Sequence, residues 1–414
     1  MLSATFKFAE TFLLKGHKKH WSRDRNSIRK INMAVSASGF NHCLFLDPLG
    51  SVWSCGINQY GGLGLGHSTN ILTPEKINNL PPIIAISAGY HFSLYVDANG
   101  SVWSCGYNQN GQLGLGDVKH RNVPEQIKNL PKIKSALAFG NSSMFLDCEG
   151  SVWSCGYNAH GELGLGDTSH RNKAEKIQGL PAIKSIAGGY HHALFLDCEG
   201  SAWSCGYNTH GNLGLGDTSH RNKAEKIEGL PAIKSMAGGV HFSMFVDEEG
   251  KVWVCGGNCF GELGLGNRRK IKSPQPNKVS DIVAVAGGNP DFSMFLDKQG
   301  NIFTCGNNLY GQLGLGDKDE RHTPQKVNNI PPMSSLSSCN TADGYLQIVD
   351  GEGGVWSCGK NDVGQLGLGH TNATLTFQKI ESNPNLKGKE EATQEGSAGE
   401  REMFKSIGRN KAQT

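Results

Sequence analysis

The feature that most constrains this 414-residue chain is a segment that recurs every fifty residues. SVWSCGYN begins at Ser101 and again at Ser151, and a seventh copy, GVWSCGKN, begins three residues late at Gly354. Related segments begin at Ser51, Ser201, Lys251 and Asn301. The register shifts only within 328–345, so the extra residues lie there. A fixed period of this length is typical of repeat architectures, in which the number of units sets the size of the fold.

One unit, residues 183–227, shows how the repeat is built. IKSIAGG and HHALFLD are β-prone runs that end at a glycine pair and at a turn. Cys198-Glu199-Gly200 is a hairpin signal between two apolar runs, and SAWSCGYN follows it as a third strand. A glycine-rich loop then leads to AEKI, which we predict as a short fourth strand.

Four short strands every fifty residues predict an all-β fold, a seven-bladed β-propeller with four short antiparallel strands per blade. Blades packed between two neighbours bury both faces of each sheet, and a closed ring has no end blades. A parallel β-solenoid needs coils of roughly 20–30 residues and lacks hairpins, which this repeat does not fit. We expect the propeller to span residues 31–380. We expect residues 1–30 to be a basic N-terminal segment with a candidate ring-closing strand, and 381–414 to be a disordered polar tail.

Two positions in the third strand repeat through the chain. Large aromatic side chains at the first should pack between blades, because each blade needs an apolar contact with its neighbour. Cysteines at the second are small buried hydrophobes, not disulfides or metal ligands, because no CxxC or His/Cys spacing is present. We expect reduced thiols in the cytoplasm or nucleus, no bound metal and no cofactor. These residues are Trp53, Trp103, Trp153, Trp203, Trp253 and Trp356, and Cys55, Cys105, Cys155, Cys205, Cys255, Cys305 and Cys358.

The sequence contains no motif that indicates covalent catalysis. Its glycine stretches, such as GQLGLG at 111–116, follow a strand and precede no helix, so they do not resemble phosphate-binding loops. Nucleophile-elbow, HExxH and Walker motifs are also missing from the sequence. We therefore expect a protein that is not an enzyme in the covalent sense.

The repeated residues resemble a known family. The pattern of [AG]-G-x-H, then L-x-x-D-x-x-G-x-V-W-S-C-G, then N-x-x-G-x-L-G-L-G-D is similar to the regulator-of-chromosome-condensation repeat, over about 350 of the 414 residues. The resemblance implies a seven-bladed propeller. The founding member is a guanine-nucleotide exchange factor for Ran that docks on chromatin, and many relatives are interaction modules linked to small GTPases, ubiquitin ligases or kinases. Exchange in the founding type depends on a β-wedge inserted into one blade. The strict spacing from Trp53 through Phe303 shows no such insertion.

Antiparallel strands alternate in direction, so the connections can be assigned to two faces of the ring. The turn after the first strand and the long loop after the third lie on one face, and the remaining connections on the other. The first set carries basic residues, and the second carries aspartates such as Asp97, Asp147 and Asp197. We expect opposite charge on the two faces, and we read His91, His191 and His241 as turn residues. Our hypothesis is that the basic loops bind a partner, through Lys119, Arg121, Arg171, Lys173, Arg221, Lys223, Arg268, Arg269 and Lys270.

The function we predict is a monomeric protein-interaction scaffold that binds or regulates a small GTPase or another protein. One alternative is a guanine-nucleotide exchange factor for a Ran-like small GTPase. The other is a chromatin- or nucleic-acid-associated binder, for which the formal net charge of +3 gives no global electrostatic support. No apolar run reaches the roughly 18 residues that a membrane span requires.

Overall fold

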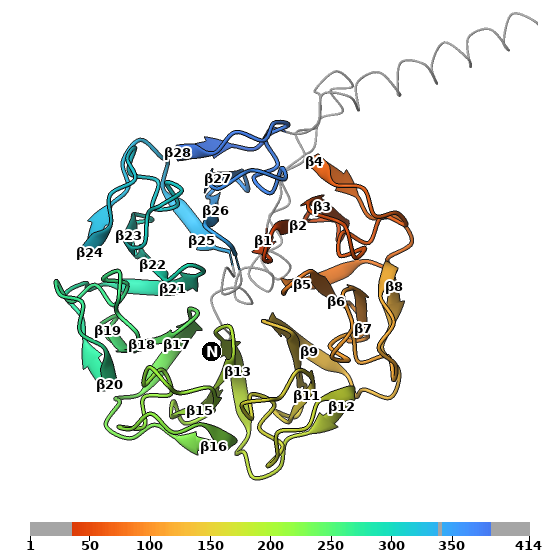
Figure 1. Ribbon diagram of the computed structural model, residues 1–414, viewed down its shortest axis with the longest axis horizontal. Coiled ribbons are helices and arrows are strands. Elements are labelled where there is room, and N and C mark those ends of the chain that lie inside the picture. Colours follow the sequence, from red (N-terminus) through yellow and green to blue (C-terminus); the bar gives the residue numbers. More distant parts are fainter. Residues whose placement is uncertain (1–34, 338–341, 382–414) are drawn as a thin grey trace, which may run out of the picture. The chain divides into compact units, whose positions relative to one another are not determined.

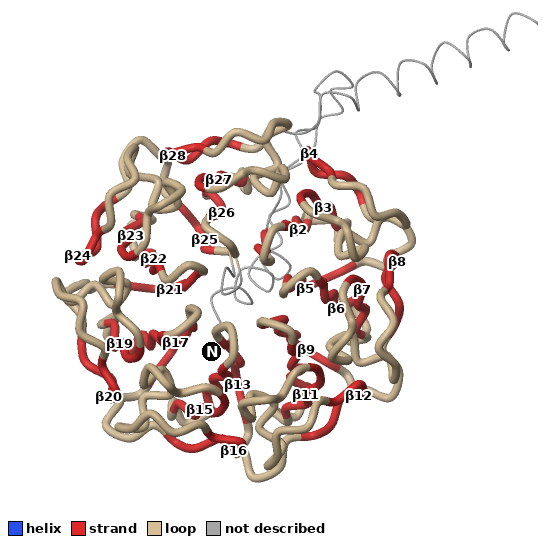
Figure 2. Tube along the Cα trace, in the orientation of Figure 1, coloured by secondary structure: helices blue, strands red, loops and turns tan. Residues whose placement is uncertain are grey.

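The computed structural model describes residues 35–337 and 342–381, and these form seven four-stranded antiparallel sheets arranged as a ring (Figure 1). In every sheet the four strands follow chain order, with the first nearest the ring axis and the fourth outermost (Figure 1). The predicted all-β, seven-bladed propeller is therefore confirmed. The described part of the chain is made of strands and loops (Figure 2), and it holds no helix long and apolar enough to cross a membrane.

Each blade takes its strands from one continuous stretch of chain. Blade 1 holds β1 (Val35–Ser38), β2 (His42–Leu46), β3 (Val52–Gly56) and β4 (Ile71–Lys76). Blade 2 holds β5 (Ile83–Ala88), β6 (Phe92–Asp97), β7 (Val102–Gly106) and β8 (Arg121–Gln126). Blade 3 holds β9 (Ile133–Phe139), β10 (Ser142–Asp147), β11 (Val152–Gly156) and β12 (Arg171–Lys176). Blade 4 holds β13 (Ile183–Gly188), β14 (His192–Asp197), β15 (Ala202–Gly206) and β16 (Arg221–Lys226). Blade 5 holds β17 (Ile233–Gly238), β18 (Phe242–Asp247), β19 (Val252–Gly256) and β20 (Ile271–Pro276). Blade 6 holds β21 (Ile282–Gly288), β22 (Phe292–Asp297), β23 (Ile302–Gly306) and β24 (Arg321–Lys326). Blade 7 holds β25 (Met333–Leu336), β26 (Tyr345–Asp350), β27 (Val355–Gly359) and β28 (Thr374–Lys379).

The hairpin between the second and third strands is organised by a buried aspartate. In blade 4, Asp197 Oδ1 accepts hydrogen bonds from the backbone N–H groups of Glu199 and Ser201, at 3.0 and 2.8 Å. Its Oδ2 accepts one from Trp203 Nε1 at 3.0 Å. The aspartates at this position are only 4–8% exposed, so they serve the hairpin and not the charge of the surface. They are Asp47, Asp97, Asp147, Asp197, Asp247, Asp297 and Asp350.

The structure corrects one predicted strand boundary and locates the extra residues of the seventh repeat. The fourth strand of blade 4 begins at Arg221, three residues before the predicted AEKI, because Arg221 pairs with Gly206 across a β-bulge. The residues that delay the seventh repeat lie between β25 and β26. Met333 pairs with Asp350 there, whereas Ile233 pairs with Asp247 in blade 5, so three extra residues separate the first two strands of blade 7.

The repeated aromatic and cysteine positions pack between blades. Trp153 of blade 3 packs against a cluster that joins blades 2 and 3 and includes Phe92, Leu113 and Ile127. Cys155 is fully buried in the same cluster, and its Sγ lies 3.7 Å from the carbonyl oxygen of Gln112 in blade 2. All seven repeat cysteines are 0% exposed and free. The apolar core is thus a series of layers between neighbouring sheets.

A hydrogen bond repeated between neighbouring blades closes the ring. In each GxLGLG stretch the last glycine donates its backbone N–H to the outermost strand of the next blade, as Gly166 does to the Asn222 carbonyl at 2.8 Å. Gly369 of blade 7 donates in the same way to Leu72 of blade 1, at 3.1 Å. Tyr345 Oη also donates to the Gly39 carbonyl at 2.7 Å across this seam. The described sheets therefore close without exchanging a strand, and the ring-closing strand suggested for 1–30 lies outside the described residues.

Candidate functional site

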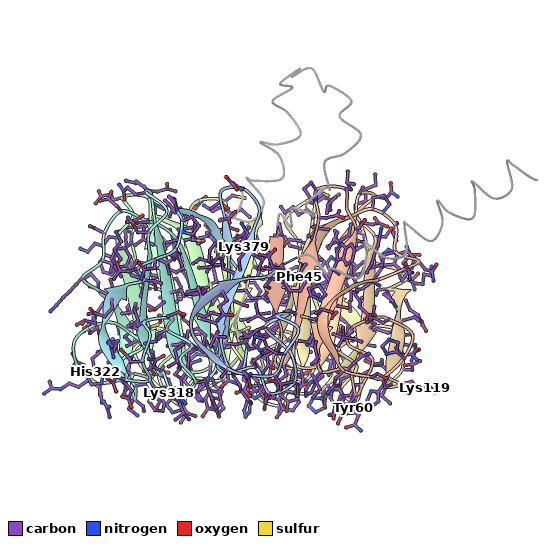
Figure 3. The ribbon with its side chains drawn as sticks, turned by 90° about the horizontal axis from the view of Figure 1, so that it is seen from above. Phe45, Tyr60, Lys119, Lys318, His322 and Lys379 are labelled. Carbon is purple, nitrogen blue, oxygen red and sulfur yellow. The ribbon has the colours of Figure 1, made fainter. Side chains whose placement is uncertain are left out.

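The ring presents two faces, which we name by their connections. The loop face carries the turns between first and second strands and the long loops between third and fourth strands. The hairpin face carries the second-to-third hairpins and the turns between blades. Figure 3 shows Tyr60, Lys119, Lys318 and His322 together on one side of the ring and Lys379 on the other. The long loops of blades 1, 2 and 6 and the end of β28 are thus on opposite sides.

The arginines expected to meet a partner are held inside their own blades. Arg171 Nη2 lies 2.7 Å from Asp167 Oδ2, and its Nε lies 2.9 Å from Glu175 Oε1. Arg121 and Arg221 make the same two ion pairs, and the three arginine side chains are only 17–19% exposed. These guanidiniums fasten the long loop to the fourth strand, and the carboxylates beside them offset their charge.

The remaining predicted cations divide into two groups. Arg268 forms an ion pair with Glu320 and donates to His322 Nε2 at 3.0 Å. Five others are exposed and have no ion pair among the described residues, namely Lys119, Lys173, Lys223, Arg269 and Lys270. The predicted opposition of charge between the faces stays a prediction, and part of the charge that it counted is paired or buried. The loop face contains its own carboxylates, and the aspartates assigned to the hairpin face are buried.

The sequence prediction missed a continuous aromatic network on the loop face. It joins blades 1 to 5 through ring-to-ring contacts of 4.4 to 6.5 Å between centroids. Its tyrosines are half-buried, and they are framed by histidines. The members are Phe40, Tyr60, Tyr90, His91, Tyr107, His120, Tyr157, His160, His170, Tyr190, His191, Tyr207, His210, His220 and His241.

The two halves of the aromatic network meet at Tyr90 and Tyr190, whose ring centroids are 6.1 Å apart. These tyrosines come from the first turns of blades 2 and 4, and blade 3 places Gly140 between them. Tyr90 donates its backbone N–H to the Gly140 carbonyl at 2.9 Å. A Cβ atom at Gly140 would lie 2.1 Å from the Tyr190 carbonyl oxygen, so only glycine permits this approach.

Three stacked tyrosine–histidine pairs repeat in blades 2, 3 and 4. Tyr157 and His170 stack with centroids 4.8 Å apart and an interplanar angle of 29°. Tyr107 with His120, and Tyr207 with His220, have nearly the same geometry. In each pair the histidine Nδ1 accepts the backbone N–H of the asparagine after the tyrosine, at 3.0 Å. A backbone N–H only donates, so Nδ1 carries no proton and the neutral imidazole holds its hydrogen on Nε2.

One repeat position holds glutamine in some blades and glutamate in others, and its glutamates lie beneath the aromatic network. Gln112 and Gln365 there donate across the blade junction to Asn141 and Asn41. Blade 3 instead has Glu162, whose Oε1 lies 3.4 Å from His191 Nδ1.

In blade 5 the same position holds Glu262, which is 1% exposed and faces Asp291 of blade 6. Burial, and secondly the charge of Asp291, raises the pKa of Glu262 to about 7. Asp291 also contacts His241, with 3.2 Å between Oδ2 and Nδ1. Burial lowers the pKa of His91 in blade 2 to about 4, so its imidazole is neutral at physiological pH.

This arrangement is suited to recognition. The described residues contain no group of three or more side chains arranged to hold a metal ion. Half-buried tyrosines and neutral imidazoles on a rigid ring offer apolar contact together with hydrogen bonds, as protein-binding surfaces do. His91, His191 and His241, read from sequence as turn residues, are also members of the aromatic network. The fifty-residue recurrence of tyrosine and histidine was visible, but no local periodicity pairs Tyr157 with His170 inside a loop.

The comparisons with known proteins agree with this fold. The family model "Regulator of chromosome condensation (RCC1) repeat" matches residues 50–96, 99–146, 149–196, 199–246, 249–296, 299–339 and 352–393. A second RCC1 repeat model matches 83–112, 183–212 and 282–312. No curated protein sequence matches the chain.

Solved structures with the same fold come from yeast and human. Prp20p of Saccharomyces cerevisiae is 22% identical with a TM-score of 0.73, over 85% of this chain and 88% of that one. Yeast RCC1 (Prp20) bound to Kap60 is 21% identical with a TM-score of 0.73, over 88% and 91%. Human WBSCR16 is 20% identical with a TM-score of 0.69, over 75% and 84%. These likenesses show the fold, and the seven matched repeats show that the chain belongs to the RCC1-repeat family.

Proposed function

We propose that this protein is a binding scaffold whose protein partner docks on the loop face, over the aromatic network. The observation that carries the proposal is the aromatic network itself, in which half-buried tyrosines framed by histidines run over five consecutive blades. Tyrosine supplies a large contact area with few rotatable bonds, and it is enriched at protein interfaces. Loops on a rigid scaffold are also the usual location of binding residues.

The exposed cations beside the aromatic network extend this surface. Lys119, Lys173, Lys223 and Arg269 lie in the long loops or at the start of the fourth strands of blades 2 to 5, and none is engaged in an ion pair among the described residues. Unpaired charges at the rim of an interface raise association rates more than affinity. We expect a partner with an acidic contact surface and a salt-sensitive association rate.

A charge-reversal experiment tests the proposal. The partner is first identified by proximity labelling in the native cell, and its affinity is then measured for two purified variants. K119E/K173E/K223E/R269E changes the loop face, and K76E/K176E/K226E/K326E reverses four exposed lysines at the ends of fourth strands. Arg171 and Arg221 are left in place because they fasten the loops. We expect the first variant to weaken binding at least about tenfold, mainly through the association rate, and the second to bind as the wild type does. Equal effects would contradict the proposal.

A second candidate is guanine-nucleotide exchange on a Ran-like small GTPase. The structure of Prp20p was reported together with "Its Binding Properties to Gsp1p and Histones", and that likeness favours this candidate. Every blade has four strands within the described residues, and no extra strand projects from one. Nucleotide release from a purified Ran-like GTPase, with and without this protein, separates the two functions. A scaffold leaves release at its intrinsic rate, and an exchange factor accelerates it.

A further inference from the structure

We infer that His120, His170 and His220 form a row of three equivalent hydrogen-bond donors that recognises an acidic protein segment. This inference rests on the proposed function, because it names the kind of partner that the loop face takes. The three histidines occupy one repeat position in three consecutive blades, and all three are exposed. The same position holds Asn70, Lys270, Glu320 and Ala373 in the other blades, so the row is confined to blades 2 to 4.

The donor character of the row follows from the contact on the other ring nitrogen. Each Nδ1 is 3.0 Å from a backbone nitrogen, of Asn108, Asn158 or Asn208, and accepts its hydrogen. The ring hydrogen is therefore on Nε2 in all three. Nε2 has no hydrogen-bond partner within the described residues, and stacking on a tyrosine fixes the ring plane. The surface thus offers three oriented N–H groups whose hydrogen bonds are unused.

Around the row of histidines, the carboxylates already have partners, whereas the ammonium groups have none among the described residues. The carboxylates of the same loops, Asp117, Asp167 and Asp217, are occupied by arginines at 2.7 Å. Lys119 directly precedes His120, while Lys173 and Lys223 each follow a row histidine by three residues, and these ammonium groups are unpaired among the described residues. Neutral donors flanked by a few cations match a ligand that presents acceptors with moderate negative charge. Carboxylate side chains on an extended chain meet this description.

The same observations disfavour a nucleic acid as the occupant. Binding to a phosphate backbone relies on a dense set of unpaired cations, whereas here each loop also carries an aspartate. Single-stranded nucleic acids stack their bases on open aromatic faces, but the tyrosine faces are covered by histidine rings at interplanar angles of 22 to 29°. An acidic protein segment needs neither feature.

The chain itself supplies a substitution that removes the outward donor, together with the stacked ring, and keeps the backbone cap of the loop. In blade 1, Asn70 Oδ1 accepts the backbone N–H of Asn58 at 2.9 Å, which is the role of histidine Nδ1 in blades 2 to 4. H120N/H170N/H220N should therefore keep the loops capped while losing all three Nε2–H groups. H67N is a matched control on the same face, because Asn267 accepts in blade 5 the backbone hydrogen bond that His67 accepts in blade 1. N70H adds a fourth donor to the row.

Fluorescence anisotropy with a labelled polyglutamate peptide and the full chain measures the effect. We expect the triple variant to raise Kd at least about tenfold, since each lost hydrogen bond to a charged group costs a measurable part of the affinity. H67N should leave Kd unchanged, and N70H should lower it. Thermal unfolding confirms that each variant is folded, and the three single variants replace the triple one if its Tm falls.

Three results would overturn the inference. The first is that polyglutamate does not bind the wild type, and the second is that it binds the triple variant as tightly as it binds the wild type. In the third, an oligothymidine of equal length binds more tightly than polyglutamate and loses that affinity in the triple variant, which would make the ligand a nucleic acid. K119E/K173E/K223E/R269E could lose the native partner while the histidine variants keep both partner and peptide. That result would support the proposed function and contradict the inference that the histidine row recognises an acidic segment.

Discussion

Replacing Glu262 by glutamine should stabilise the ring above neutral pH. Glu262 is 1% exposed beneath the loop face, and it faces Asp291 across the junction of blades 5 and 6. Burial and the neighbouring carboxylate raise its pKa from 4.5 to about 7. Because the pKa is higher in the folded state, ionising this carboxyl destabilises that state. The loss begins above the unfolded pKa and is complete once the pH exceeds the folded pKa.

The size of the effect follows from the difference between the two pKa values. A rise from 4.5 to about 7 corresponds to about 3 kcal/mol of stability lost on full ionisation. Glutamine avoids this loss, and blade 2 shows that it fits. Gln112 Oε1 accepts the Asn110 N–H at 3.0 Å, and Gln112 Nε2 donates to Asn141. In blade 5 the new amide can donate to Asp291 Oδ1, which has no hydrogen-bond partner among the described residues.

Thermal or denaturant unfolding over a range of pH tests this prediction. We expect Glu262→Gln to match the wild type near pH 4 and to gain up to about 3 kcal/mol near pH 8. Glu162→Gln is the matched control at the same repeat position, because Glu162 faces His191 and not a second carboxylate. A stability difference that stays constant with pH, or that shrinks as the pH rises, would refute the reasoning.

Two further predictions concern the ring seam and the buried thiols. Gly364→Ala should cost at least about 2 kcal/mol, because its Cβ would lie 2.5 Å from Leu72 Cδ2 at a φ of +80°. Gly179→Ala, with φ +82° and no atom within 4 Å, should cost only about 1 kcal/mol, and equal losses in Tm would contradict the seam contact. Burial raises the pKa of Cys105 to about 12, so native protein treated with a thiol reagent should leave it unmodified, and its fast labelling would contradict the packing. The exposed described thiols should react first, and these are Cys148, Cys198 and Cys259.

Much of the fold could be predicted because the repeat specifies it many times over. The hairpin signal Cys198-Glu199-Gly200 and the strand containing Trp203 recur in every unit with small changes. Seven copies of one blade leave few alternatives to a closed ring. The start of the fourth strand at Arg221 was missed, because a β-bulge decides it and not a periodic pattern.

The binding surface was less predictable because the path of the long loops decides its contacts, and not the period of a strand. Arg171 was taken for a free charge, although Asp167 and Glu175 flank it at four residues on each side and neutralise it. The stack of Tyr157 on His170 depends on the path of a loop. Counting charges by the type of connection therefore predicted two oppositely charged faces. In the structure, many of those charges form ion pairs or hydrogen bonds within their own blades.

Site-specific photo-crosslinking tests most directly the claim that a protein partner docks on the loop face. A photoreactive phenylalanine derivative is placed at Tyr157 on the loop face, or at Cys148, which is exposed in the hairpin of the same blade. We predict that the partner crosslinks from position 157 and not from position 148. Crosslinks from position 148 alone, or equally from both positions, would contradict the account.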